Sequence, residues 1–289
     1  MKLYIFSTKD DRSLNLLLEQ AKDLEVLAVF YDELRIVDGV LLWNNQHLEI
    51  DLKDRLIIRW PWLIEEHVTY DYNIFVQIII DKYSSQILLD QKCLSKYSPF
   101  YEDKLFQSFV FNDLGIKTPK TWFFLSDEDL KFEELSFPLV VKKRISSRSK
   151  HNKKFETDIE LRTWIKEINI GDYIFQEYIP AEKDIRVLVF DGQILGSVSR
   201  TMHLRENNRL AVKGQEPYEL LDNILERNIL KVSNYMGADF VGFDFLLDRD
   251  ENYFLIEANV SPQFSTFSKV TGINVAEKLV QKLVLHLYE

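Results

Sequence analysis

The segment GFDFLLDRDENYFLIEANVSP, residues 242–262, decides the fold. Two apolar runs flank the polar turn DRDEN, so the pattern predicts a β-hairpin that brings Asp244 and Glu257 side by side. Asn259 shares the face of Glu257, because side chains two positions apart along a strand point the same way. Carboxylates within such apolar strands are costly unless they are paired or coordinated; the alternative is a hairpin with a solvated acidic face. Two carboxylates and an amide oxygen are the hard ligands that Mg²⁺ prefers, so the hairpin predicts a magnesium site.

Composition narrows the classes of function. The chain has 289 residues, enough for a well-buried core and for two or three subdomains. Its net charge of −10 repels polyanions, so we expect no nucleic-acid partner and no membrane partner. Cys93 is the only cysteine, which excludes disulfides within the chain and cysteine-based zinc clusters. The apolar runs are too short for a membrane span or a signal peptide, and we therefore expect a cytoplasmic protein.

Residues 1–100 alternate strand-like and helix-like patterns, which predicts an α/β domain with a partly parallel sheet. Strands are expected at residues 2–6, 25–31 and 55–60, a hairpin around Asn44, and helices at residues 13–24 and 72–80.

The rest of the chain reads as further helices and strands. Leu105, Phe106, Phe109 and Val110 form one face of a helix that is expected to end at Gly115. Strands are expected at residues 118–124, 138–144 and 173–178, a hairpin at residues 184–200, and helices at residues 126–135, 161–168, 217–236 and 276–287.

The C-terminal hairpin and the motifs before it resemble the ATP-grasp superfamily, and most closely its RimK-type carboxylate–amine ligases. The motifs YEDKLFQSFVFNDLGIKTPKTWFF, FPLVVK, QEYIP and DIRVLVFDGQILGSVSR occur in the family's order and near its spacing. The likeness covers residues 101–289. It implies an α/β (α+β) fold, in which an N-terminal α/β domain precedes a two-subdomain ATP-grasp fold. The expected domains are residues 1–100, a central and lid subdomain at residues 101–180, and a C-terminal subdomain with the magnesium site at residues 181–289.

The resemblance implies an ATP site. Lys104 and Lys142 match the two lysines that contact the ATP phosphates, and a lysine at a strand end suits this role as a point charge. The next matching segment is the adenine hinge, where backbone groups read the edge of the base. Its residues here are Glu177, Tyr178 and Ile179.

The resemblance also implies the catalytic and metal-binding residues. Asp184 matches an acid on the ribose side, and Arg186 matches an arginine near the phosphates. Arg200 matches an arginine that stabilises charge on the reacting centre, so Arg200 and Lys142 are the expected catalytic residues. Taken alone, each arginine could also be an ordinary surface residue of a strand. Lys104, taken alone, could be an ordinary exposed lysine of a helix. The residues that match the magnesium ligands are Asp244, Glu257 and Asn259.

The reaction that the resemblance implies is amide formation. A substrate carboxylate attacks the γ-phosphate of ATP and forms an acyl phosphate with release of ADP, and an amine then displaces phosphate. Two Mg²⁺ ions are expected, with Mn²⁺ as a substitute. The carboxylate and the amine belong to an amino acid, a peptide or a protein. Family members commonly self-associate, which indicates a homo-oligomer.

The basic loop KRISSRSKHNKK, residues 143–154, departs from the family pattern. The family has a glycine-rich loop here, and glycine permits close backbone approach to the phosphates. We expect the Ser147 hydroxyl and the Arg148 guanidinium to contact ATP instead. Two alternatives stay open: a nucleotide-binding protein without ligase turnover, and a nucleic-acid site, which predicts steeply salt-dependent binding.

A second departure lies in NNRLAVKGQ, residues 207–215, which places Leu210 where the family has an asparagine. Arg209 is expected to compensate and to contact ATP.

Two further features bear on the substrate. Gln263 and Phe264 resemble their counterparts in ATP-grasp enzymes that cross-link ribosomally made peptides, so a cross-linking ligase is another alternative. Arg59, Trp60 and Trp62 either line the acceptor side or pack at a domain interface.

Overall fold

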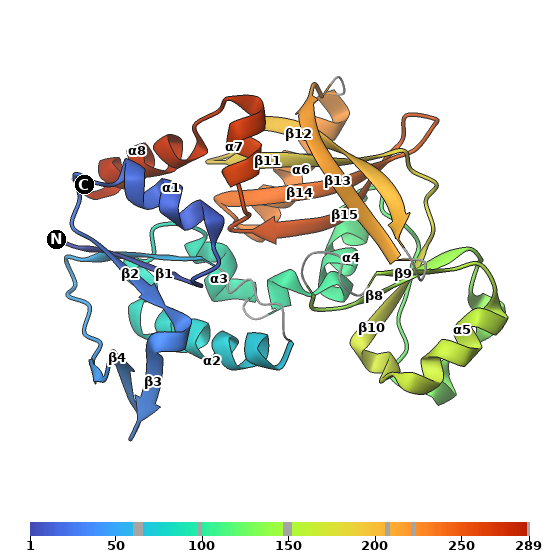
Figure 1. Ribbon diagram of the computed structural model, residues 1–289, viewed down its shortest axis with the longest axis horizontal. Helices are drawn as coiled ribbons and strands as arrows, with labels where there is room; N and C mark the ends of the chain where they lie inside the picture. Colours follow the sequence, from blue (N-terminus) through green and yellow to red (C-terminus); the bar gives the residue numbers. More distant parts are fainter. Residues whose placement is uncertain (60–65, 98–99, 147–151, 206–208, 221–222, 288–289) are drawn as a thin grey trace.

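The computed structural model describes residues 1–59, 66–97, 100–146, 152–205, 209–220 and 223–287. These residues form the mixed α/β fold that the sequence predicts, with one long sheet and two three-stranded sheets (Figure 1). Trp60, Trp62, Ser147 and Arg148, which the sequence analysis singled out, lie outside the described residues.

The first sheet is parallel and belongs to the N-terminal part of the chain. β1 (Leu3–Ser7) lies between β2 (Val26–Phe30) and β6 (Arg55–Ile58). β1 is buried along its whole length, because a central parallel strand is covered on both faces. α1 (Arg12–Gln20) connects β1 to β2, as a parallel pair requires.

A small antiparallel sheet and two helices complete the N-terminal part. The turn at Asn44 and Asn45 has positive φ at both residues, the geometry of a tight two-residue hairpin, and confirms the predicted hairpin. The expected helix at residues 72–80 lies within a longer one. The remaining elements are β3 (Leu34–Val37), β4 (Val40–Trp43), β5 (Gln46–His47), α2 (Glu66–Tyr83) and α3 (Gln91–Tyr97).

A nine-stranded sheet carries the site described below. Its strand order is β15-β14-β11-β12-β13-β9-β8-β10-β7, and all neighbours are antiparallel. The strands are β7 (Thr121–Trp122), β8 (Leu139–Lys143), β9 (Lys153–Phe155), β10 (Tyr173–Glu177), β11 (Lys183–Phe190), β12 (Gln193–Arg205), β13 (Arg209–Tyr218), β14 (Phe240–Leu247) and β15 (Tyr253–Val260).

This sheet consists of two halves. The proximal half-sheet comprises β11 to β15, and the distal half-sheet comprises β7 to β10 (Figure 1). Within the part of the chain that the structure describes, one residue pair, Arg209 with Lys153, joins the two halves in the register, and the Leu210 amide donates to the Asn152 carbonyl at 3.3 Å beside it. Each half also packs on its own set of helices.

Three hydrophobic cores correspond to this division. Two of them unite the N-terminal part with the two faces of the proximal half-sheet, through α6 on one side and α1 and α8 on the other. The third core lies under α5 and belongs to the distal half-sheet alone. The helices of this part are α4 (Lys104–Asp113), α5 (Asp158–Trp164), α6 (Asn223–Met236), α7 (Ser265–Thr271) and α8 (Val275–Leu287).

Two expectations for secondary structure are wrong. The helix predicted at residues 217–236 begins only at Asn223, because Pro217 belongs to β13. Proline is tolerated there since that end of β13 pairs with β12 but has no described partner on its other edge. The acidic helix predicted at residues 126–135 is replaced by two short 3₁₀ turns, Asp127–Asp129 and Phe132–Glu134.

None of the helices within the described ranges is long and apolar enough to cross a membrane. The division into domains at residues 100 and 180 stays a prediction.

Candidate functional site

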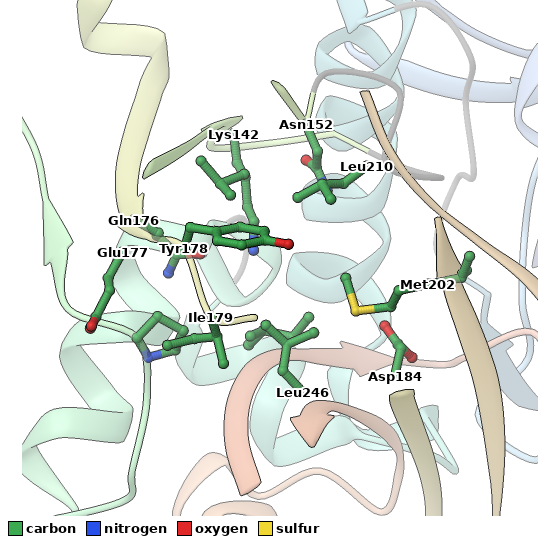
Figure 2. Close-up of a pocket in the computed structure, with 14 residues that line it drawn as sticks. Lys142, Asn152, Gln176, Glu177, Tyr178, Ile179, Asp184, Met202, Leu210 and Leu246 are labelled. Atoms are coloured by element: carbon green, nitrogen blue, oxygen red, sulfur yellow. The ribbon is translucent and has the colours of Figure 1, made fainter. Parts of the chain in front are cut away.

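A cavity lies between the two half-sheets. It contains about 530 Å³ of space free of protein atoms, including open solvent at its mouth. Most of its wall is apolar, and Lys142 and Asp184 carry the charge within it (Figure 2). The lining residues are Pro119, Val140, Lys142, Asn152, Gln176, Glu177, Tyr178, Ile179, Asp184, Met202, Leu210, Val212, Leu246 and Ile256.

Strand alternation explains which side chains of the distal half-sheet reach the cavity. Lys142 on β8 and Gln176 on β10 lie on one face, with Val140 opposite Gln176 in the register. Val141 and Phe175 point to the other face and belong to the distal core. One face of this half-sheet therefore lines the cavity, while its other face packs against α5.

Glu177, Tyr178 and Ile179 all line the cavity, as expected for a hinge. The Glu177 side chain is exposed and points away from the cavity in Figure 2, so only its backbone is placed to contact a ligand. Tyr178 lies across the cavity, and the Lys154 amine sits 3.9 Å from the centre of its ring. That cation–π contact fixes the ring at the wall.

Lys142 is a buried cation, and among the residues that the structure describes its amine has no hydrogen-bond or ion-pair partner. Burial lowers the pKa of Lys142 to about 8, with Lys104 adding repulsion and Glu257 opposing the shift. The amine is still mainly protonated at neutral pH. An unpaired buried ammonium in a cavity is a ready partner for an anionic ligand.

Lys104 lies at the first turn of α4, whose N-cap is Asp103. Its amine is 2.9 Å from the Glu257 carboxylate and donates to the Ser146 carbonyl at 3.1 Å. Lys104 therefore connects the helix to β15 and to the start of the basic loop. It is a buried ion-pair residue, which excludes the alternative of an ordinary exposed helix lysine.

Four charged side chains form a row across β14, β11 and β12. Arg186 holds Asp244 through two hydrogen bonds of 2.7 and 2.6 Å, and Arg200 lies 3.1 Å from the same carboxylate. Arg200 also donates to Asp184, its neighbour across the strands. These partly or fully buried pairs exclude the alternative that both arginines are surface residues.

The row sets the protonation of its two acids. Burial alone would raise the pKa of Asp244, but Arg186 and Arg200 outweigh it and lower the pKa to about 2. Burial raises the pKa of Asp184, and the negative charge on Asp244 adds to the rise while Arg200 opposes it. Asp244 is therefore the acid that stays ionised at all ordinary pH values.

The three expected metal ligands share one face of the terminal hairpin. Asp244 lies directly opposite Glu257, and Asn259 follows two positions later on β15. Each is already engaged by other side chains: Glu257 by Lys104, and Asp244 by Arg186 and, at 3.5 Å, by the Asn259 amide. Carboxylate oxygens keep further lone pairs, so this set of hard donors fits Mg²⁺ in type. Within the described ranges there is no cluster of three or more His, Cys, Asp or Glu side chains.

Two expected ATP contacts in the basic segments, Ser147 and Arg148, lie outside the described residues. Arg209 is placed only as the first residue of β13, and its backbone lies at the junction of the half-sheets. Leu210, at the position where the family has asparagine, forms part of the apolar wall (Figure 2).

Sequence reasoning missed several residues near the cavity. Gln176 and Met202 line the cavity. For Gln176 a signal was available, because strand alternation places it on the same face as Lys142 of the neighbouring strand. Glu102 was also missed: it is buried and accepts a hydrogen bond from the Val260 amide at 3.0 Å. Burial, together with the charge of Glu257, raises the pKa of Glu102 to about 8.

Arg59 lies between the N-terminal part and the loop after β15, so it packs at an interface within the chain. It is only 1% exposed and donates to Asp11 and to Ser261, so it joins the N-terminal part to the loop after β15. Gln263 donates to Asp11 and Phe264 is fully buried in the core beside α1. Gln263 and Phe264 therefore both take part in the packing between the N-terminal part and the C-terminal loop.

Comparisons with known proteins agree with this geometry. The RimK-like ATP-grasp domain family matches residues 81–283 of the chain. A coenzyme gamma-F420-2:alpha-L-glutamate ligase of Methanococcus maripaludis is 26% identical over 244 residues, which cover 81% of this chain and 78% of that protein. An alpha-aminoadipate–LysW ligase of Saccharolobus solfataricus is 24% identical over 232 residues, which cover 76% and 82%. The fold is also similar to the ATP-grasp ligase PsnB in complex with a phosphomimetic variant of its minimal precursor, Mg and ADP, with a TM-score of 0.73, 14% identity and coverage of 99% and 98%.

Proposed function

We propose that this protein joins a carboxylate to an amine at the cavity between the half-sheets, with ATP as the energy source. The chain belongs to the RimK-like ATP-grasp family of carbon–nitrogen ligases. One of the two substrates in this proposal is an α-amino dicarboxylic acid. The observation that carries the site assignment is the buried Lys142 amine, which has no partner among the residues that the structure describes.

The cavity suits a nucleotide with a flat apolar base and a charged tail. Apolar side chains from both half-sheets, such as Val140 and Leu246, can enclose a ring between them. Lys142 supplies the charge that a phosphate group requires, and no ion-pair partner from the described residues has to be displaced from it. The expected contacts of residues 177–179 with the base belong to this proposal.

Charge neutralisation is the second task of the site. The transfer of a phosphoryl group spreads negative charge over its oxygens, and fixed cations that are already oriented stabilise that charge. Lys142 and Arg200 are the cations we assign to this role, with Arg186 beside them. Asp184 and Asp244 hold the two guanidinium groups in place, so little reorientation is needed during the reaction.

Asp244, Glu257 and Asn259 would hold Mg²⁺, which supplies further neutralisation of the phosphate charge when bound. In this proposal Lys104 has two roles. It contacts phosphate, and it orients Glu257 through the 2.9 Å ion pair.

The substrate class follows from the two relatives named above, whose names carry glutamate and aminoadipate. Both are α-amino dicarboxylic acids, and we propose one such acid as the amine-bearing substrate. The carboxylate that reacts with ATP then belongs to a second molecule, which can be an amino acid, a peptide or a protein.

The test is a nucleotide-release assay on the purified full chain. With ATP, Mg²⁺ and a pool of carboxylates, glutamate or aminoadipate should increase the release of ADP and phosphate, and AMP should not appear. AMP as the product would contradict an acyl phosphate route. Turnover with peptides but with no free amino acid would overturn the substrate class and favour the peptide cross-linking alternative.

A further inference from the structure

Gln107 on α4 binds the backbone of β15, which lies beside that helix (Figure 1). Gln107 is 1% exposed. Its Nε2 donates to the Ala258 carbonyl at 2.7 Å, and its Oε1 accepts from the Ala258 amide at 3.0 Å. Nε2 also donates to the Tyr101 carbonyl at 2.7 Å. A flipped amide would turn its oxygen toward two carbonyl oxygens, so these partners fix its orientation.

β15 is an edge strand in the described part of the sheet, with β14 as its neighbour. Buried backbone groups on the outer side of an edge strand need partners that are not strands. Gln107 gives Ala258 both an acceptor and a donor, as a peptide unit of a further strand would. Glu102 serves the outer side two residues along, where it accepts from the Val260 amide at 3.0 Å.

The pairing of β15 with β14 is irregular close to this point. The register shifts between Asp244 and Phe245, directly beside the pair of Asp244 with Glu257. Such a shift disrupts the ladder of backbone hydrogen bonds and bends the strand. Contacts from outside the sheet therefore contribute to the path of the backbone here.

Ala258 lies between Glu257 and Asn259, two of the proposed metal ligands. Its bonds with Gln107 restrain the backbone between these ligands, and so the direction in which their side chains leave the strand. Lys104, three residues before Gln107 on the same side of α4, pairs with the Glu257 carboxylate at 2.9 Å. α4 thus restrains the ligand pair through a side chain and through the backbone.

We propose that Gln107 is a positioning residue of the metal site: through the backbone of Ala258 it holds Glu257 and Asn259 in the arrangement that a divalent cation requires. The inference rests on the proposed function, in which these side chains bind Mg²⁺. Mg²⁺ demands a nearly octahedral set of ligands, so a displaced ligand weakens its binding. Groups that orient metal ligands contribute about 10–100-fold to metal affinity.

Calorimetric titrations of the full chain with ADP, first with EDTA and then at increasing free Mg²⁺, test the inference without knowledge of the other substrates. Mg²⁺ should strengthen ADP binding, and the concentration that gives half of this effect measures the affinity of the metal site. In Gln107→Met, which keeps the length of the side chain but lacks its polar groups, this concentration should rise at least about tenfold. ADP affinity with EDTA should stay the same, because Gln107 does not line the cavity.

Gln86→Met is the matched control. Gln86 is also a buried glutamine, 4% exposed, and its Nε2 donates to the carbonyls of Asp51 and Asp54 in the N-terminal part. Both variants should be less stable in urea denaturation, because each leaves buried carbonyls without a donor. Only Gln107→Met should change the Mg²⁺ concentration, which a purely structural role would leave unaltered.

Gln107→Asn replaces Gln107→Met if the latter does not fold. It retains an amide, but its side chain is one methylene shorter and cannot reach both backbone groups of Ala258 from the same position. The Mg²⁺ concentration should rise in this variant too, by a smaller factor.

The outcomes separate the two claims. An unchanged Mg²⁺ concentration in a folded variant of Gln107, or an equal rise in Gln86→Met, would overturn the positioning role and leave the proposed function intact. ADP binding that does not respond to Mg²⁺ in the unchanged protein would overturn the metal site and the inference with it. Failure to bind ADP or ATP at all would overturn the proposed function itself.

Discussion

Arg186 holds Asp244 with both arms of its guanidinium group, Nε at 2.7 Å from Oδ1 and Nη2 at 2.6 Å from Oδ2. Asp244 and Glu257 lie opposite each other, yet the two carboxylates differ in burial and in the charged side chains that they pair with. Asp244 is buried and pairs with Arg186 and Arg200, whereas the Glu257 side chain is 22% exposed and, among the described residues, pairs with Lys104. Two acids with one proposed function thus have different structural roles.

The first prediction compares Asp244→Asn with Glu257→Gln. Both should reduce ADP release by at least about 100-fold, since each removes a charged ligand of the proposed metal site. Only Asp244→Asn should also lower stability substantially, by about 3 kcal/mol, because it leaves two guanidinium groups with less compensation. Steady-state ADP release and urea denaturation measure the two effects. Full activity in either variant would contradict the assignment of the metal ligands.

The second prediction concerns the cost of the unpaired cation. Lys142→Met should abolish activity and raise stability by on the order of 1 kcal/mol, because an apolar side chain replaces a buried charge. The gain should be present in full below pH 8, decrease between pH 8 and 10.5, and vanish above pH 10.5, where the lysine is neutral in both the folded and the unfolded state. Thermal denaturation measures it. Lys166→Met, at an exposed position in the distal part, is the matched control and should change neither property.

The third prediction is a pH dependence of nucleotide binding. Phosphate favours the charged form of Lys142, and free Lys142 loses its proton as pH rises through about 8. The affinity for ADP should therefore be constant just below pH 8 and fall above it, by up to about tenfold for each pH unit. Calorimetry between pH 7 and 9.5 measures the profile. Lys142→Met should bind weakly at every pH, and a wild-type profile that stays flat to pH 9.5 would remove Lys142 from the phosphate site.

The fourth prediction concerns the contact between the N-terminal part and the loop after β15. Arg59→Met should destabilise the protein by about 3–5 kcal/mol, because it leaves the buried Asp11 carboxylate without its positively charged partner. Burial would raise the pKa of Asp11, but Arg59 outweighs it and lowers the pKa to about 2. The pair therefore contributes stability above pH 3.8, and this contribution is lost as pH falls through about 2.

Denaturant titrations at pH 7 and at low pH check the fourth prediction. Arg249→Met is the control, since Arg249 is 80% exposed in its pair with Glu182 and should contribute little. If Arg59→Met were as stable as that control, the ion pair of Arg59 with Asp11 would not contribute to stability, and the prediction would be wrong.

The hairpin at the C-terminal end could be predicted almost completely from the sequence. Local alternation and a polar turn determine it, and the structure places Asp244 opposite Glu257 as expected. The partners of these acids could not be predicted in the same way. Arg186 is 58 residues from Asp244, and only the order of the strands in the sheet brings the two together.

β13 illustrates the other limit of sequence reasoning. Leu210 and Val212 alternate toward the cavity, but Gly214 and Pro217 interrupt the pattern and favour a turn or a helix start. Pairing with β12 stabilises the strand despite both residues. Tertiary contacts overrode the local pattern, and the apolar wall of the cavity was missed together with the strand.

The junction between the half-sheets has an energetic consequence. Among the described residues, 152 and 153 meet 209 and 210 through one register pair, and each backbone hydrogen bond contributes about 1 kcal/mol net. The distal half-sheet keeps a separate hydrophobic core, so bending at this seam exposes little of it. The described backbone contacts at the junction therefore contribute only roughly 1–2 kcal/mol against bending, and the hydrogen bond of Lys104 with Ser146 adds to them.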